Sequence, residues 1–68
     1  MKPISGKRMC KALVRRGWQF ARIAGSHPIY KHTNTAETTS VPSHANEDLR
    51  PGTQRKIMRQ AGLTDGDL

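Results

Sequence analysis

The sequence predicts a two-layer α+β domain in the order helix, three antiparallel strands, helix, with both helices on one face of the sheet. Apolar residues recur at helical spacing over 5–16 and 51–62, and β-prone segments separated by turn formers lie between them. With 68 residues the chain is expected to form one domain, 1–68. So small a core requires both helices to cover the same apolar sheet face.

The first helix is expected to begin after Ser5 and to end near Arg16. Ser5 suits the N-cap, and Ile4 before it can contact Met9 across the first turn. Gly17 suits the left-handed residue that ends a helix. The apolar positions recur at spacings of three and four, at Met9, Cys10, Leu13 and Val14.

Three strands are expected between residues 18 and 41. The first covers 18–24, and Gly25-Ser26 forms the two-residue turn that leads into the second, 27–32. The third covers 38–41 after a polar loop. The sequence therefore predicts an antiparallel hairpin followed by one further strand.

The second helix is expected from Pro51 to Gly62. Proline suits the first helical turn, and glycine suits the residue after the last one. Leu63 is expected to fold back as the hydrophobic contact of the cap, and 64–68 to form a loose tail. The inner face of this region consists of Leu49, Ile57, Met58 and Ala61.

Positive charge is concentrated in the first half of the chain. The formal net charge is +7, and residues 1–34 contain eight Lys or Arg residues and no acid. A one-sided basic surface on a small domain is typical of a protein that binds a polyanion, because neutralised phosphates release counterions. A solvated surface without a ligand is the alternative.

The basic residues form two helical ridges. Lys7, Lys11 and Arg15 are spaced by four on the exposed side of the first helix, with Arg8 beside them. We interpret both ridges as phosphate contacts, although two solvated helix faces are the simpler alternative. The ridge of the second helix consists of Arg55, Lys56 and Arg59.

His27 follows the Gly25-Ser26 turn directly, so we expect its ring at the rim of the sheet. An imidazole can accept or donate a proton near neutral pH, and RNA carries its own nucleophile, the 2′-hydroxyl. Lys31 and Arg22 are candidates to stabilise the charge that develops on a phosphate. A hairpin histidine without a chemical role is the alternative.

The other candidate residues favour simpler interpretations. A metal site of His27, His32 and His44 is not expected, because the first two project to opposite faces of one strand and no carboxylate or thiol lies at ligand spacing. His32 is interpreted as a surface strand residue. His44 is either a second acid or phosphate contact near the rim, or a loop-fixing hydrogen-bond partner. We therefore expect no metal and no cofactor.

Cys10 and Trp18 are interpreted as core residues and not as a nucleophile and a base-stacking platform. The single cysteine cannot form an internal disulfide, which suits a reducing cytosol. No apolar run approaches the length of a membrane span. Secretion and membrane association are therefore not expected.

Four motifs occur in one order along nearly the whole chain. They are Arg16-Gly17-Trp18, Gly25-Ser26-His27, Val41-Pro42-Ser43-His44, and Gly52-Thr53 leading through Ile57 to Ala61-Gly62-Leu63. In this order they resemble the HicA toxins, small mRNA-cleaving proteins with a fold like a double-stranded-RNA-binding domain. The resemblance implies the toxin of a type II toxin–antitoxin system, acting in the cytoplasm as a metal-independent endoribonuclease.

The resemblance also implies roles for single residues and a partner. His27 matches the family's catalytic histidine, and a HicB-type antitoxin would bind the domain and cover that residue. The auxiliary candidates are His44, Ser26 and Lys31. The residues expected to bind RNA are Lys7, Arg8, Lys11, Arg15, Arg22, Arg55, Lys56 and Arg59. The alternatives are a non-catalytic RNA-binding module of the same fold and a regulatory protein whose basic face meets an acidic partner.

Overall fold

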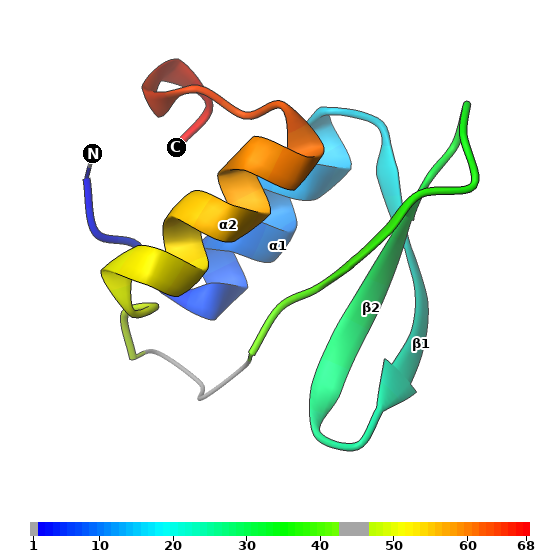
Figure 1. The fold of residues 1–68 in the computed structure, drawn as a ribbon, viewed down its shortest axis with the longest axis horizontal. Helices are drawn as coiled ribbons and strands as arrows, with labels where there is room; N and C mark the ends of the chain where they lie inside the picture. The colour runs from blue at the N-terminus through cyan, green and yellow to red at the C-terminus, as the bar shows by residue number, and fades with distance from the viewer. Residues whose placement is uncertain (1, 43–46) are drawn as a thin grey trace.

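A computed structural model describes residues 2–42 and 47–68 and confirms the predicted order of elements (Figure 1). The strands form an antiparallel sheet in the order β1-β2-β3, and both helices cover one face of it (Figure 1). The elements are α1 (Gly6–Arg15), β1 (Trp18–Ala24), β2 (His27–His32), β3 (Thr38–Ser40), α2 (Pro51–Ala61) and the 3₁₀ turn η1 (Asp65–Asp67).

The N-terminal end of α1 has the predicted cap. Ser5 is extended, and its hydroxyl accepts the Arg8 N–H at 3.2 Å. Ile4 and Met9 are both buried, as expected for a hydrophobic staple. Gly17 follows the helix with φ +90°, a backbone angle that favours glycine, and it turns the chain into β1.

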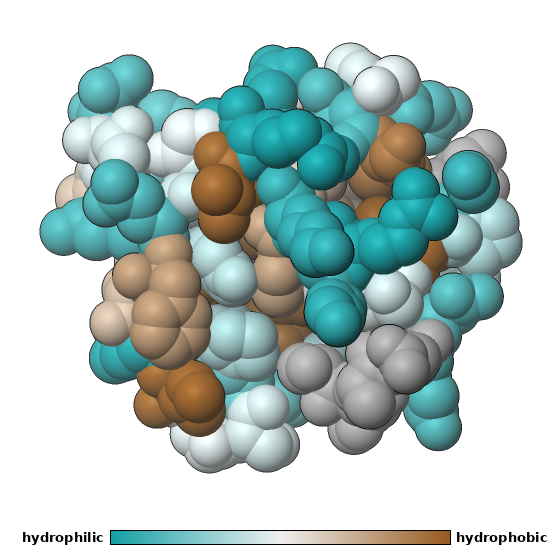
Figure 2. All heavy atoms as spheres, turned by 180° about the vertical axis from the view of Figure 1, so that it is seen from behind, coloured by the Kyte–Doolittle hydropathy of each residue, from teal (hydrophilic) through white to brown (hydrophobic). Residues whose placement is uncertain are grey.

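A bulge interrupts the pairing of β1 with β2. Phe20 is opposite Tyr30, and Ile23 is opposite Pro28, with the register shifted by one residue between them. Since Pro28 and Tyr30 lie two apart on β2, their side chains share one face, and so do those of Phe20 and Ile23. Hydrophobic atoms are exposed on the side of the molecule that Figure 2 shows.

The end of β3 and both ends of α2 agree closely with expectation. β3 stops at Ser40, one residue early, but Val41 is buried and its N–H bonds to the Pro28 carbonyl at 3.1 Å. Gly62 ends α2 with φ +69°. Leu63 folds back as predicted, because its side chain is buried and its N–H reaches the Met58 carbonyl at 2.9 Å.

The core lies between the helices and the sheet, and two polar residues, Thr39 and Gln54, are buried with it. Gln54 of α2 is fully buried, where its Oε1 accepts the Ile4 N–H at 3.2 Å and its Nε2 donates to the Lys2 carbonyl at 2.6 Å. The sequence pattern did not single out this residue. The buried hydrophobic residues are Ile4, Met9, Ala12, Leu13, Trp18, Tyr30, Val41, Leu49, Ile57, Met58 and Leu63.

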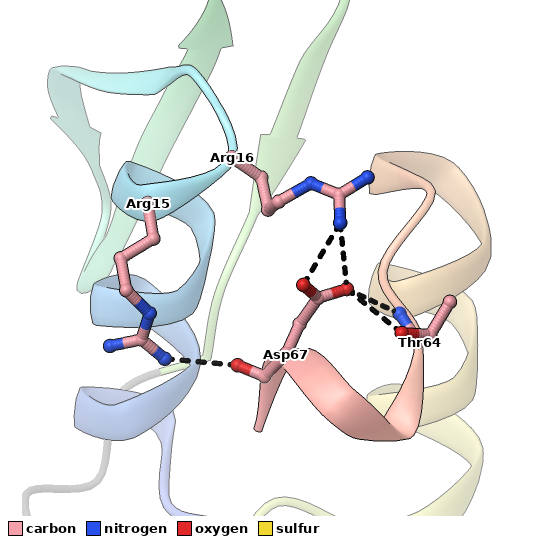
Figure 3. A network of polar contacts seen from close by, with 4 residues as sticks. All are labelled: Arg15, Arg16, Thr64 and Asp67. Carbon is pink, nitrogen blue, oxygen red and sulfur yellow. Dashed lines mark hydrogen bonds and ion pairs between the residues drawn. The ribbon is translucent and has the colours of Figure 1, made fainter.

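The prediction of a loose tail is wrong. Residues 65–67 form η1, and the Asp67 carboxylate accepts the Thr64 N–H at 2.7 Å and pairs with Arg16 Nη1 at 2.9 and 3.1 Å (Figure 3). Arg15 donates to the Asp67 carbonyl at 2.9 Å, and Leu68 packs against the core. The ion pair joins residues 51 apart in the sequence, so no local pattern indicates it.

Candidate functional site

His27 is the first residue of β2 and follows the hairpin turn. Gly25 has φ +63°, which lets two residues reverse the chain so that His27 pairs with Ala24. The His27 side chain is half-buried and lines two adjoining grooves, each of about 450 Å³. The ring therefore lies at the rim of the sheet with access to solvent, as the sequence predicts.

The first of these grooves, here called the cationic groove, runs between the sheet and α2. Arg22 of β1 and Lys56 of α2 line it together with His27. The Thr39 hydroxyl donates to Gln60 Oε1 at 2.9 Å and so ties β3 to α2 at its floor. The other lining residues are Ile29, Thr38, Ser40, Pro42, Thr53 and Ile57.

The second groove, here called the mixed-charge groove, extends from His27 to the N-terminal end of α2. Glu47, Asp48 and Arg50 line it, and Pro42, Leu49 and Thr53 complete it. The Leu49 N–H donates to the Ile4 carbonyl at 2.8 Å, which anchors this wall to the start of the chain. The imidazole thus lies between a cationic region and one that also contains carboxylates.

Only part of the predicted site gathers around His27. Arg22 and Lys56 share a groove with it, whereas Arg55 and Arg59 are exposed on α2 and line neither groove. Arg50 was not predicted as a site residue. Its position directly before the helix-starting Pro51 was the available signal, because that position places its side chain at the N-terminal end of α2.

The auxiliary candidates lie elsewhere or outside the described residues. Lys31 is four residues along β2 from His27, about 13 Å at the usual rise of a strand, and lines a separate hollow with Gln19 and Thr33. Ser26 is exposed in the hairpin turn. His44 lies outside the residues that the structure describes.

The basic residues of α1 lie in a different groove from His27. Lys7, Lys11 and Arg15 line a hollow of about 420 Å³ with Cys10, Val14 and Tyr30. Arg8 is also exposed on α1 but lines none of these grooves. The two basic ridges predicted from the sequence therefore do not converge on one groove.

Cys10 and Tyr30 meet beneath this hollow. Cys10 is partly buried and packs against the core, which agrees with the packing role expected of it. Burial raises the pKa of Tyr30 to about 12, and the neighbouring Cys10 side chain acts in the same direction. The Tyr30 hydroxyl is therefore neutral near neutral pH.

Trp18 and His32 form an aromatic pair at the other end of the sheet. Trp18 is buried, which confirms its place in the core. His32 is half-buried against it, edge to face at 5.2 Å between ring centroids, and its Nδ1 accepts the Asn34 N–H at 3.1 Å. His32 is thus a strand residue at the surface, as expected, and in addition it covers Trp18 and caps the following turn.

Residues 2–42 and 47–68 show neither a metal-binding cluster nor a membrane-spanning helix. No three His, Cys, Asp or Glu side chains in these ranges lie close enough to hold a metal ion together. Within the same ranges, no helix has the length and apolar character needed to cross a membrane.

The likeness to known proteins can now be added to this geometry. A family model described as HicA toxin of bacterial toxin-antitoxin matches residues 6–63. The chain belongs to the HicA toxin family. The HicA match extends from the start of α1 to Leu63 and includes His27 and every residue that lines its two grooves. No curated protein matches the chain.

Membership of the HicA family agrees with the observed fold, an α+β sheet with two helices like that of a double-stranded-RNA-binding domain. It also makes this chain the toxin half of a toxin–antitoxin pair.

Proposed function

We propose that this HicA toxin is an endoribonuclease that cleaves mRNA, with His27 as its general acid or base. One observation carries the proposal: a solvent-accessible imidazole lies where two grooves meet, with cationic side chains on both sides. Arg22 and Lys56 lie on one side. Arg50 lies on the other together with Glu47 and Asp48, so we assign the phosphodiester to the cationic groove. An RNA backbone that lies in such a groove would bring one phosphodiester next to the imidazole.

In the proposed reaction the 2′-oxygen of the RNA attacks the adjacent phosphorus. A bond forms between phosphorus and the 2′-oxygen while the bond to the 5′-oxygen breaks, which leaves a cyclic phosphate and a 5′-hydroxyl. His27 either takes the proton from the 2′-hydroxyl or supplies one to the leaving 5′-oxygen. Such acid–base help typically accelerates a reaction by about 10²- to 10⁴-fold.

Arg22 and Lys56 are proposed to stabilise the negative charge that develops on the phosphate. Preorganised cations in a groove lower the free energy of a charged transition state without reorganising during the reaction. Neither attack by the 2′-hydroxyl nor this stabilisation requires a metal ion. The proposed enzyme therefore uses no metal and no cofactor.

The remaining basic residues are proposed to attract and hold the RNA chain. Phosphate contacts of this kind give sequence-independent affinity that falls with salt. Ser26, Lys31 and His44 stay auxiliary candidates. The proposed RNA-binding residues are Lys7, Arg8, Lys11, Arg15, Arg22, Arg50, Arg55, Lys56 and Arg59.

We further propose that the partner is a HicB-type antitoxin that covers His27, and that the toxin acts in the cytoplasm, where mRNA is found. The same cationic groove would also suit a non-catalytic RNA-binding module. That alternative differs in one respect: it would bind RNA without cleaving it.

The proposed chemistry is tested with an RNA that carries a single 2′-deoxy sugar at the cleaved position. We expect this substrate to survive while the all-ribose RNA is cut, and we expect a chelator to leave the cleavage rate unchanged. The products should be a cyclic phosphate and a 5′-hydroxyl, measured by mass spectrometry. Cleavage of the deoxy substrate at the same bond would overturn the mechanism.

A further inference from the structure

Three large hydrophobic side chains are exposed on one side of the molecule. Among the described residues, Val14 is 56%, Phe20 55% and Ile23 63% exposed. Hydrophobic atoms gather on the hairpin side of the view in Figure 2, next to hydrophilic ones. Isolated exposed hydrophobic residues are common, so what matters is whether these three adjoin.

Tyr30 and the bulge in β1 link them. The bulge in β1 turns Phe20 and Ile23 to the same face of the hairpin, although they are three residues apart. The Phe20 ring meets the Tyr30 ring edge to face at 6.0 Å between centroids, and Tyr30 lines a hollow with Val14 of α1. We therefore treat the three exposed side chains, linked through the buried Tyr30, as one apolar surface, here called the α1–β1 face.

Positive charge borders the α1–β1 face. Lys7, Lys11 and Arg15 line the hollow of about 420 Å³ that contains Val14 and Tyr30. Residues 1–34 contain no acid, so no carboxylate from α1, β1 or β2 offsets these cations, although Arg15 also donates to the Asp67 carbonyl of η1. The surface therefore complements a ligand that presents both apolar side chains and carboxylates.

We propose that an acidic segment of a partner protein docks on the α1–β1 face with its apolar side chains against Val14, Phe20 and Ile23. In a toxin–antitoxin pair that partner is the antitoxin. The proposal thus rests on the partner stated under the proposed function, and it is independent of the cleavage chemistry.

Other occupants fit the α1–β1 face less well. A second copy would place Lys7, Lys11 and Arg15 against like charges, which costs free energy. RNA bases stack on aromatic rings, and two of the three exposed side chains are aliphatic. A lipid surface cannot pair with backbone groups, whereas a peptide can add to β1, which forms an edge of the sheet.

The α1–β1 face is separate from the site proposed for cleavage. Side chains alternate along β2, so His27 and Ile29 project from the face opposite to that of Pro28 and Tyr30. A segment docked here would not itself touch the His27 ring, so it would be a second contact of the antitoxin that is proposed to cover that ring. It would still neutralise the α1 cations and so weaken the attraction of RNA.

The experiment combines Val14→Ser, Phe20→Ser and Ile23→Ser and measures the Kd for the antitoxin encoded with this toxin. Since Gln19 is exposed on the opposite face of β1, Gln19→Ser is the matched control. We expect the triple variant to bind the antitoxin at least tenfold more weakly, with unchanged affinity for RNA. The control should keep both affinities.

An unchanged Kd for the antitoxin would overturn the proposal. So would an equal loss of RNA affinity, or selective loss of binding to phosphatidylglycerol vesicles, because these results would assign the face to RNA or to a membrane. If the triple variant fails to fold, Ile23→Ser and Lys11→Glu are measured singly, and each should weaken antitoxin binding severalfold. If the wild-type toxin never cleaves RNA, the proposed function is contradicted. The Kd for the antitoxin still tests the docking proposal in that case.

Discussion

Gln54 joins α2 to the N-terminal segment through one buried amide. Its Oε1 accepts the Ile4 N–H, and its Nε2 donates to the Lys2 carbonyl. We expect Gln54→Ala to lower the free energy of unfolding by about 2–3 kcal/mol, because the buried N–H loses its acceptor and a cavity remains. Urea denaturation measures the change, and exposed Gln19→Ala is the control. Equal midpoints for the two variants would contradict this role.

Asp67 makes stability depend on acid pH. The Thr64 backbone N–H, and then the Arg16 guanidinium, lower the pKa of Asp67 below its usual value. The native state therefore favours the ionised carboxylate of Asp67. Its contribution to stability is complete above the usual carboxyl pKa of the unfolded chain, and it is lost as the pH falls through the lowered pKa of the folded state.

We therefore expect Asp67→Asn to lower the melting temperature at pH 7, with the difference from wild type narrowing below about pH 4. Thermal unfolding across this range measures the difference. A difference that stays constant down to pH 2 would show that the ionised carboxylate is not what stabilises the C-terminal turn.

Substitution by alanine should change the stability of the fold in opposite directions at the two glycines at the ends of α2. Gly62 has φ +69°, where a Cβ costs about 1 kcal/mol, whereas a Cβ on helical Gly52 meets nothing within 4 Å. Gly62→Ala should destabilise the fold by about 1 kcal/mol, and Gly52→Ala should stabilise it by about 0.5–1 kcal/mol. Thermal unfolding compares them, and shifts of the same sign would contradict the assigned cap.

Local sequence signals were sufficient for most elements. Ser5, the Gly25-Ser26 turn and Gly62 each act on their immediate neighbours, and the bounds they predict agree with the structure to within a residue or so. Local signals did not predict the η1 turn, because the contact between Arg16 and Asp67 depends on the assembled fold. The bulge in β1 also had no local sign, since Ala21 and Arg22 are ordinary strand residues.

The candidate site was predicted less completely than the fold. The position of His27 at the sheet rim followed from the turn before it. The sequence did not predict which residues surround His27, because Lys56 and Arg50 reach its grooves only when α2 packs beside β3. Helical spacing alone indicates which face a residue occupies, and it does not indicate which element lies opposite.

At the scale of the whole molecule, the charge should determine how RNA affinity depends on salt. If Arg22 and Lys56 contact phosphates, removing both should reduce the slope of log K against log salt by about 1.4 for a single strand. The double variant Arg22→Ala/Lys56→Ala is compared with Lys31→Ala, which lies in another hollow. Equal slopes for these two variants would argue against RNA in the cationic groove.

The central claim is that one imidazole between the two grooves cleaves the RNA that the surrounding cations hold. The most direct test measures single-turnover cleavage and RNA affinity for wild type and His27→Ala in parallel. We predict that the variant loses cleavage by at least a hundredfold while its Kd for RNA changes by less than threefold. Cleavage at the wild-type rate by the folded variant would contradict the account.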